Sequence, residues 1–285
     1  MTGVYRLIAV VLPLVVAAAV TTSEAVGQAR GAYLGDLSWP DAEERLKTTP
    51  LVVVPFGAGA KEHGPQLPMN ADALVMEYLC RQAVDSVDVI VAPAILHGWF
   101  PAFREFPGTE VQDPEVFTDY VFQVARSLVR QGAQRIVFLN TGISRATGLP
   151  ISIAARELRV QTGTPTLVVS WDDLETPEAD ALASERAGGH AGEMETSIHL
   201  FLQPGLVDMD KAVTDYRSPS AAHPGYAPGL FSRDRGDPAY SDTGLFGDPT
   251  LATPEKGEAL LRIMTHEWLE ALREFSDAPV PEVRE

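Results

Sequence analysis

Residues 51–83 read LVVVPFGAGAKEHGPQLPMNADALVMEYLCRQA and decide the fold. They begin with a run rich in valine, Leu51–Pro55, that is typical of a strand buried on both faces. They end with apolar residues at helical spacing over Asp72–Ala83. Between these two lies a loop, Ala58–Asp72, in which proline residues restrict the path of the chain. The stretch therefore predicts one strand–loop–helix unit of an α/β protein.

The same alternation continues along the chain. Further strands are predicted at Val89–Ala92, Arg135–Asn140 and Thr166–Trp171, and further helices at Pro114–Arg130, Leu149–Gln161, Met194–Leu202 and Glu255–Phe275. This order predicts a three-layer α/β/α fold with a mainly parallel central sheet. Ligands of such sheets bind beyond the carboxyl ends of the strands, which is where the polar loops of this chain fall.

The first residues do not belong to this pattern. Arg6 precedes an apolar run, Leu7–Val20, which is short for a membrane span and is followed by small residues at cleavage spacing. We expect a signal peptide within residues 1–29 and one domain over residues 30–285. An uncleaved anchor is the alternative. The protein is then exported, to the periplasm or the extracellular space. Residues 216–252 are irregular, and such a long segment is typical of a lid, an interface arm or disorder.

Composition excludes several functions. The formal net charge is −17 and no basic stripe is present, so we expect no nucleic-acid partner and no membrane partner after signal cleavage. Cys80 is the single cysteine, which rules out an intrachain disulfide and a Cys₄ or Cys₂His₂ zinc site. Its helical setting favours a small buried side chain over a nucleophile.

Four polar residues form a candidate site. His63, Asp72 and Glu193 make a nitrogen and oxygen ligand set suited to zinc or manganese. A metal held there would lower the pKa of a bound water and polarise a carbonyl group. His190 lies three residues before Glu193, so both would face one side of a helix and His190 could move protons. The alternative is that these residues are hydrogen-bonded structural groups.

Three further residues are candidates for the wall of a substrate pocket. His97 follows the second predicted strand, and Trp171-Asp172 follows the fourth, so all three fall at the same edge of the sheet. A tryptophan at a strand end is equally well explained as a core residue.

Several separated segments carry a resemblance. AKEHGPQLPMNAD (60–72) resembles a run E-Q-H-G-P-H-L-P…D, and FPGT (106–109) matches F-P-G-T. RIVFLNTGIS (135–144) resembles a strand that ends in N-G-H-G-G-N. HAGEMETS (190–197) and GLFGDPTLATPEKGE (244–258) match two further motifs. On these motifs the chain resembles the creatininase family of metal-dependent amide hydrolases, and the resemblance spans roughly residues 51–275.

The resemblance implies a two-metal site. The family's ligands are a Glu, a His, a bridging Asp, a second His and a second Glu. The first His is similar to His63, the bridging Asp to Asp72 and the second Glu to Glu193, while the family's proton-handling His matches His190.

Two ligands depart from the family pattern. The first Glu falls on Lys61, and the His of N-G-H-G-G-N falls on Gly142. A Glu–His pair before F-P-G-T likewise falls on Ala102 and Phe103. By this resemblance one metal position is lost and one is kept. A lysine ammonium could replace the charge of the lost cation beside Asp72.

The resemblance therefore implies a hydrolase of a C–N bond in a small amide or cyclic amide, with one zinc or manganese ion per chain. His190 would transfer the proton, and Lys61 or the metal would hold the oxyanion. It also implies a homo-oligomer, often a hexamer. The alternative is a non-catalytic binding or assembly protein with a degenerate site that holds no metal. Glu62 is a further, weaker candidate for a replacement ligand, because neighbouring side chains on an extended segment point to opposite sides.

Overall fold

A computed structural model describes residues 29–142, 146–216 and 240–279. The predicted signal segment, except for its last residue, lies outside these ranges, as does most of the irregular segment 216–252. Within the described residues, no helix has both the length and the apolar character that a membrane crossing needs. The predictions of export, of a cleaved signal and of a single domain over residues 30–285 therefore remain predictions.

The centre of the molecule is a five-stranded sheet whose strands all run parallel. Its spatial order is β1-β3-β2-β4-β5. The strands are β1 (Ala32–Tyr33), β2 (Leu51–Phe56), β3 (Val89–Val91), β4 (Ile136–Asn140) and β5 (Thr166–Ser170). Strand β2 lies in the middle, where Val53 pairs with Val91 of β3 and with Val137 of β4. Because β2, β3 and β4 are buried along their whole length, apolar residues fill both faces.

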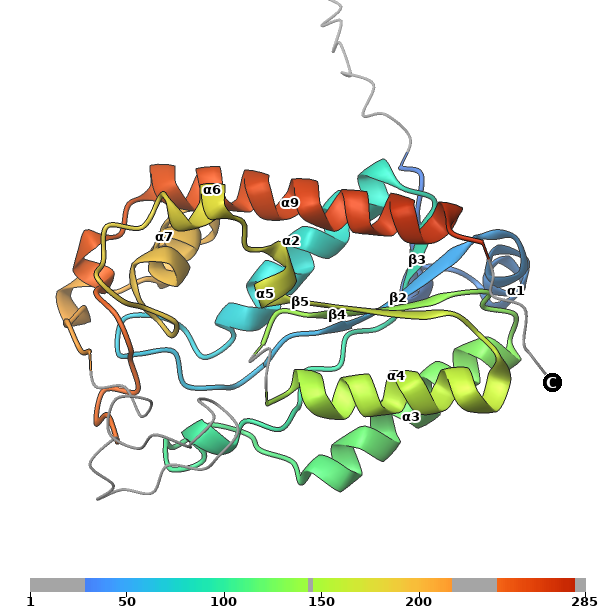
Figure 1. Cartoon of the computed structure of the whole chain (residues 1–285), viewed down its shortest axis with the longest axis horizontal. Coiled ribbons are helices and arrows are strands. Elements are labelled where there is room, and N and C mark those ends of the chain that lie inside the picture. Colours follow the sequence, from blue (N-terminus) through green and yellow to red (C-terminus); the bar gives the residue numbers. More distant parts are fainter. Residues whose placement is uncertain (1–28, 143–145, 217–239, 280–285) are drawn as a thin grey trace, which may run out of the picture.

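Helices cover both faces of the sheet (Figure 1). On one side lie α2 (Ala71–Ser86), α5 (Trp171–Leu174), α6 (Pro177–Asp180), α7 (Glu193–Leu202) and α9 (Pro254–Asp277). A second apolar cluster, against the opposite face of the sheet, contains side chains of α1 (Trp39–Thr48), α3 (Pro114–Arg130) and α4 (Gly148–Thr162). Each layer encloses its own apolar cluster, with Trp268 of α9 buried in one and Phe117 of α3 in the other. The predicted three-layer α/β/α fold is confirmed.

The predicted elements agree closely with these bounds. The helix Pro114–Arg130 begins and ends as predicted, and Thr253 caps α9 by accepting a hydrogen bond from the backbone N–H of Lys256. Cys80 is buried in α2, and burial raises the pKa of its thiol to about 12, as expected for a packed and unreactive side chain. Strand β1 and helix α1 were not predicted, because two residues make too short a strand and α1 buries a single side chain fully, Leu46.

The topology places the candidate site at a switch point. After β2 the chain forms β3 on one side of β2 and then crosses to form β4 on the other side of β2. The loops that follow β2 and β4 therefore lie next to each other. Thr141 joins these loops, since its backbone N–H bonds to Phe56 O and its hydroxyl donates to Asp72 O at 2.8 Å. Gly57 permits the first turn of α2 to lie against the end of β2, because a β-carbon there would lie 2.9 Å from the Ala73 Cα.

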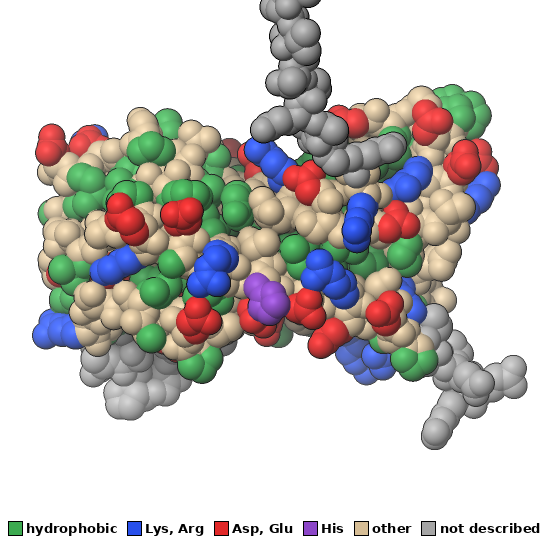
Figure 2. All heavy atoms as spheres, turned by 90° about the horizontal axis from the view of Figure 1, so that it is seen from above, with side chains coloured by type: hydrophobic (Ala, Val, Ile, Leu, Met, Phe, Trp, Pro, Cys, Tyr) green, Lys and Arg blue, Asp and Glu red, His purple; other side chains and the backbone are tan. Residues whose placement is uncertain are grey.

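The face seen from above in Figure 2 carries intermixed Lys, Arg, Asp and Glu side chains. No continuous stripe of Lys and Arg crosses this face.

Candidate active site

The loop after β2 is closed by backbone hydrogen bonds. The Lys61 N–H donates to Met69 O at 2.9 Å, so residues 61 and 69 lie side by side although eight positions separate them. Gly64 lies in the left-handed region at φ 69°, where a residue with a β-carbon is disfavoured. The loop therefore brings both of its ends to the first turn of α2 and holds residues 61–63 over Asp72.

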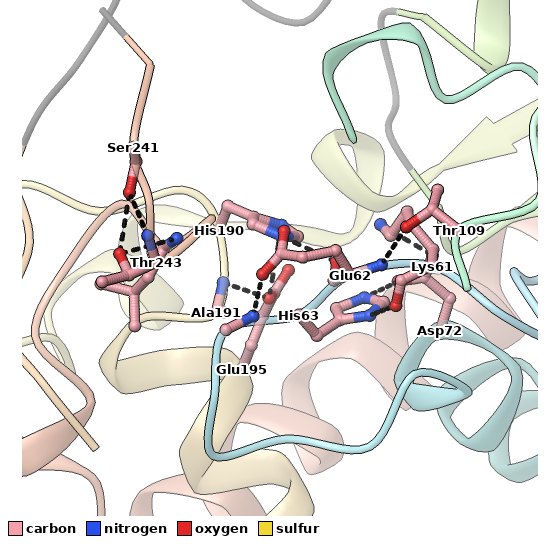
Figure 3. Close-up of polar contacts among 12 residues, drawn as sticks. Lys61, Glu62, His63, Asp72, Thr109, His190, Ala191, Glu195, Ser241 and Thr243 are labelled. Atoms are coloured by element: carbon pink, nitrogen blue, oxygen red, sulfur yellow. Dashed lines mark hydrogen bonds and ion pairs between the residues drawn. The ribbon is translucent and has the colours of Figure 1, made fainter. Parts of the chain in front are cut away.

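Lys61, His63 and Asp72 form one buried ionic group (Figure 3). Lys61 Nζ lies 2.8 Å from Asp72 Oδ2, and His63 Nε2 lies 2.8 Å from Asp72 Oδ1. The exposed fraction is 2% for Lys61 and His63 and 4% for Asp72. Asp72 also lies in the first turn of α2, where the helix dipole favours a negative charge. The prediction that Lys61 lies beside Asp72 agrees with this geometry.

The cations around Asp72 keep its carboxyl ionised. Burial opposes ionisation, but the Lys61 ammonium and the His63 ring outweigh it and hold the pKa of Asp72 well below its ordinary value. His63 adds a further restraint, because its Nδ1 lies 2.9 Å from Lys61 O. Both ring nitrogens thus face oxygen atoms, so contacts on two sides hold the His63 ring in place.

A second pair lies beside this group. Glu62 points away from Asp72, and its Oε2 lies 3.0 Å from His190 Nε2. Burial opposes ionisation of Glu62, yet His190 and the Gly64 N–H, which donates to Oε1, hold the pKa of Glu62 below its ordinary value. On the far side of the ring, His190 Nδ1 lies 4.0 Å from Glu195 Oε2. His190 is therefore placed between two carboxylates.

Aromatic rings enclose both pairs. Phe103 stacks on the His190 ring at 4.3 Å between centroids. Lys61 Nζ also lies near Phe103, at 5.6 Å from the Phe103 centroid. Phe106 stacks in turn on Tyr240 at 5.6 Å. Phe103 stands where the resemblance places a histidine, so an apolar ring fills the space of a polar one.

Glu193 does not join the group, contrary to the prediction from sequence. It begins α7, its side chain is 0% exposed, and its Oε2 accepts hydrogen bonds from the Ser184 and Glu185 N–H groups at 2.7 and 2.6 Å. Its other oxygen pairs with Lys256. His190 precedes α7 and bridges to Phe246 instead, so the expected shared helical face does not form. Glu193 acts as a structural tie between the loop before α7 and the start of α9.

His97, Trp171 and Asp172, the three candidates for the pocket wall, lie outside the buried ionic group. His97 is half exposed and its Nδ1 pairs with Glu110 Oε2 at 2.7 Å. Trp171 begins α5, packs partly against the apolar core and donates from Nε1 to Glu175 Oε1 at 2.7 Å. Asp172 is exposed. The core explanation of Trp171 fits its position, and none of the three contacts the buried ionic group.

The donors present do not fit the two-metal centre that the resemblance implies. Two of its five ligand positions carry ligand side chains that lie together, His63 and Asp72. Their facing atoms, Nε2 and Oδ1, are within hydrogen-bond distance of each other. Lys61 places a cation on the second Asp72 oxygen, and Gly142 offers no ligand. Catalytic zinc sites use three protein ligands. Among the described residues, no group of three or more His, Cys, Asp or Glu side chains could hold a metal ion.

Sequence reasoning missed the carboxylates of His190. Glu62 was weighed as a metal ligand and not as a partner of histidine, although the alternation of an extended segment already sends it away from Asp72. Glu195 lies within the HAGEMETS segment, and its Oε2 accepts a hydrogen bond from the Ala191 N–H at 2.6 Å. The signal for Glu195 was its place in the same segment as His190. Glu62 lies 128 positions from His190, and the alternation of side-chain directions was its only signal.

Comparisons with known proteins agree with this fold. A family model described as Creatininase: Creatinine amidohydrolase matches residues 35–272. The creatinine amidohydrolase of Pseudomonas putida is 30% identical over 262 residues, which cover 86% of this chain and 97% of that protein. The mycofactocin precursor peptide peptidase of Mycolicibacterium smegmatis is 27% identical over 82% of this chain and 89% of its own length.

Two solved structures give the same result. A creatininase described as the Mn form superimposes with a TM-score of 0.73 at 28% identity, over 87% of this chain and 100% of that one. A mutant creatininase of Zn-Zn type also gives a TM-score of 0.73 at 28% identity, over 86% of this chain and 98% of that one. With the matched family model and the shared fold, these relatives show that the chain is a member of the creatininase family.

Proposed function

We propose that this protein hydrolyses a C–N bond in a small amide or cyclic amide and that His190 transfers the proton. Membership of the creatininase family supports hydrolysis of a C–N bond, because the matched relatives include a creatinine amidohydrolase and a peptide peptidase. The observation that carries the role of His190 is its position between Glu62 and Glu195, next to the buried ionic group.

The reaction needs one proton to be moved twice. Water attacks the carbonyl carbon while its proton passes to His190, and the C–N bond then breaks as His190 returns that proton to the leaving nitrogen. The products are a carboxylic acid and an amine. The His190 side chain keeps 12% of its surface exposed, whereas Lys61, His63 and Asp72 are almost fully buried. This difference favours His190 as the group that meets the substrate.

Lys61 supplies a fixed positive charge. Its ammonium is engaged with Asp72 and lies between the Phe100 and Phe103 rings, at 5.7 and 5.6 Å from their centroids. A direct contact with a substrate oxygen would require that Phe103 move aside. We therefore assign Lys61 the task of neutralising Asp72 and preserving the positive field at the site, and not that of a primary oxyanion donor.

A divalent metal is supported by the relatives described as Mn and Zn forms. The expectation of one zinc or manganese ion per chain stays a prediction, because the donors present do not fit the family centre.

A panel of small amides and lactams, including creatinine, tests the proposed function. Activity is measured in protein treated with a chelator and in protein supplied with zinc or manganese. We expect turnover of at least one amide, and its loss in His190→Asn. Failure of the protein to turn over any member of the panel, whether or not metal is supplied, would favour the non-catalytic alternative.

Export and assembly form a separate proposal. We expect the mature chain to start near residue 30 and to form a homo-oligomer. Mass spectrometry of protein secreted by a bacterial host tests the first expectation, and light scattering tests the second. An intact N-terminus would support the anchor, and a monomeric mass would refute the oligomer.

A further inference from the structure

Contacts with its own loop and with other segments hold Glu62 in place. Its backbone N–H donates to Thr109 Oγ1 at 3.1 Å, and its carboxylate accepts from the Gly64 N–H. Gly244, at φ 72°, lies against the carboxylate so closely that a β-carbon there would clash with it. Thr109 thus fixes the backbone of Glu62, while Gly64 and Gly244 restrict the direction of its side chain.

The contacts of Glu62 determine which nitrogen of His190 carries a proton. His190 Nε2 lies 3.0 Å from Glu62 Oε2 and 3.0 Å from Glu62 O. Both neighbours are acceptors, so Nε2 must be the donor. In a neutral ring the proton then sits on Nε2, and Nδ1 keeps the lone pair that can accept a proton.

The other ring nitrogen faces Glu195. Nδ1 lies 4.0 Å from Glu195 Oε2, which is beyond hydrogen-bond distance, so this carboxylate does not take up the Nδ1 lone pair. Phe103 stacks on the ring and limits its rotation, so the direction of Nδ1 is set by packing as well as by hydrogen bonding.

We propose that Glu62 is a positioning residue that holds His190 as the Nε2–H tautomer, so that Nδ1 takes the proton from water during hydrolysis. This inference rests on the proposed function. The proton leaves water for Nδ1 as oxygen bonds to the carbonyl carbon, and Nδ1 returns it to the nitrogen of the broken C–N bond. Glu62 stays ionised throughout and stabilises the imidazolium that forms between the two transfers.

The test compares Glu62→Gln with Glu110→Gln. Glu110 pairs with His97, and both side chains are about half exposed. Glu110→Gln therefore controls for the loss of a carboxylate beside a histidine outside the site. Ring ¹⁵N shifts of His190, assigned with His190→Asn, report the tautomer without any substrate. Steady-state kinetics on the amide found in the panel report kcat and KM separately.

We expect wild-type protein and Glu110→Gln to show the Nε2–H tautomer. In Glu62→Gln the backbone O of residue 62 still accepts from Nε2, so we expect the same tautomer. We expect kcat to fall by about 100-fold or more, with little change in KM, because the imidazolium loses its carboxylate partner. Glu62→Asp should restore part of kcat.

Two results would overturn the proposal: a proton on Nδ1 in the neutral ring of the wild-type protein, or a kcat in Glu62→Gln equal to that of the wild type. If an amide is turned over and Glu62→Gln keeps full kcat, the role of Glu62 is refuted while the proposed function stands. If no amide is turned over, the proposed function fails, and the ¹⁵N shifts still decide which nitrogen of His190 carries the proton.

Discussion

Replacing Lys61 with methionine tests the buried ionic group most directly. Methionine keeps most of the side-chain volume and removes the ammonium that lies 2.8 Å from Asp72 Oδ2. The Asp72 carboxylate is 4% exposed, so water cannot replace the lost partner. Breaking a buried pair in this way costs about 3–5 kcal/mol. His63 still bonds the other Asp72 oxygen, which favours the lower half of this range.

Urea and thermal unfolding measure this cost. At about 2–4 °C of melting temperature per kcal/mol, Lys61→Met should lower the melting temperature by about 6–16 °C. The double variant Lys61→Met/Asp72→Asn removes both charges and should recover most of the loss, because replacing a whole buried pair is often close to neutral. A Lys61→Met protein as stable as the wild type, or a double variant less stable than the single one, would refute the reasoning.

Three further predictions follow from other parts of the structure. Lys61→Glu/Gly142→His should bind manganese or zinc more tightly than the wild type by elemental analysis after desalting, since a β-carbon at residue 142 lies 3.4 Å from an Asp72 oxygen. Burial lowers the pKa of His199 from 6.5 to about 4, so folding stability should fall by about 2 kcal/mol between pH 7 and pH 5 in urea unfolding, because the unfolded chain binds the proton first. Lys256→Met should cost about 1–3 kcal/mol, because it leaves the Glu193 carboxylate buried without its cation.

Each of these has a control and a contrary result. A metal content no higher in the double variant than in the wild type would contradict the first prediction. His199→Leu should reduce the pH dependence of stability, and an unchanged dependence would assign it to another group. Lys47→Met breaks an exposed pair with Glu43 and should cost less than about 0.5 kcal/mol. A similar cost for Lys47→Met and Lys256→Met would contradict the structural role given to Glu193.

The fold could be predicted from the sequence because buried elements have a recognisable composition. The run Leu51–Pro55 is apolar at every position, and β2 is buried along its whole length. The spacing of Pro114–Arg130 predicts a helix between a proline and the following loop, and α3 has those bounds. Strand β1 was missed because its two residues gain their place by pairing with β3, a contact that no local pattern records.

The site was predicted in part. His63, Asp72 and Lys61 lie within one short loop and meet as expected, since the loop has few ways to close. Glu193 was assigned to the same group by resemblance, but its carboxylate meets Lys256, which lies 63 positions along the chain. Which of two directions a carboxylate takes depends on cations and N–H groups from distant segments, and spacing within one motif does not record them.

The salt bridge on Asp72 has a consequence for how the site responds to its surroundings. A bound ion occupies its position to a degree that depends on the free concentration of that ion and on its dissociation constant. The Lys61 ammonium is attached to the chain and stays beside Asp72 at every dilution. A chelator cannot remove it, and a competing metal cannot exchange with it. The electrostatic field around Asp72 is therefore a property of the folded chain and does not depend on the concentration of free metal ions.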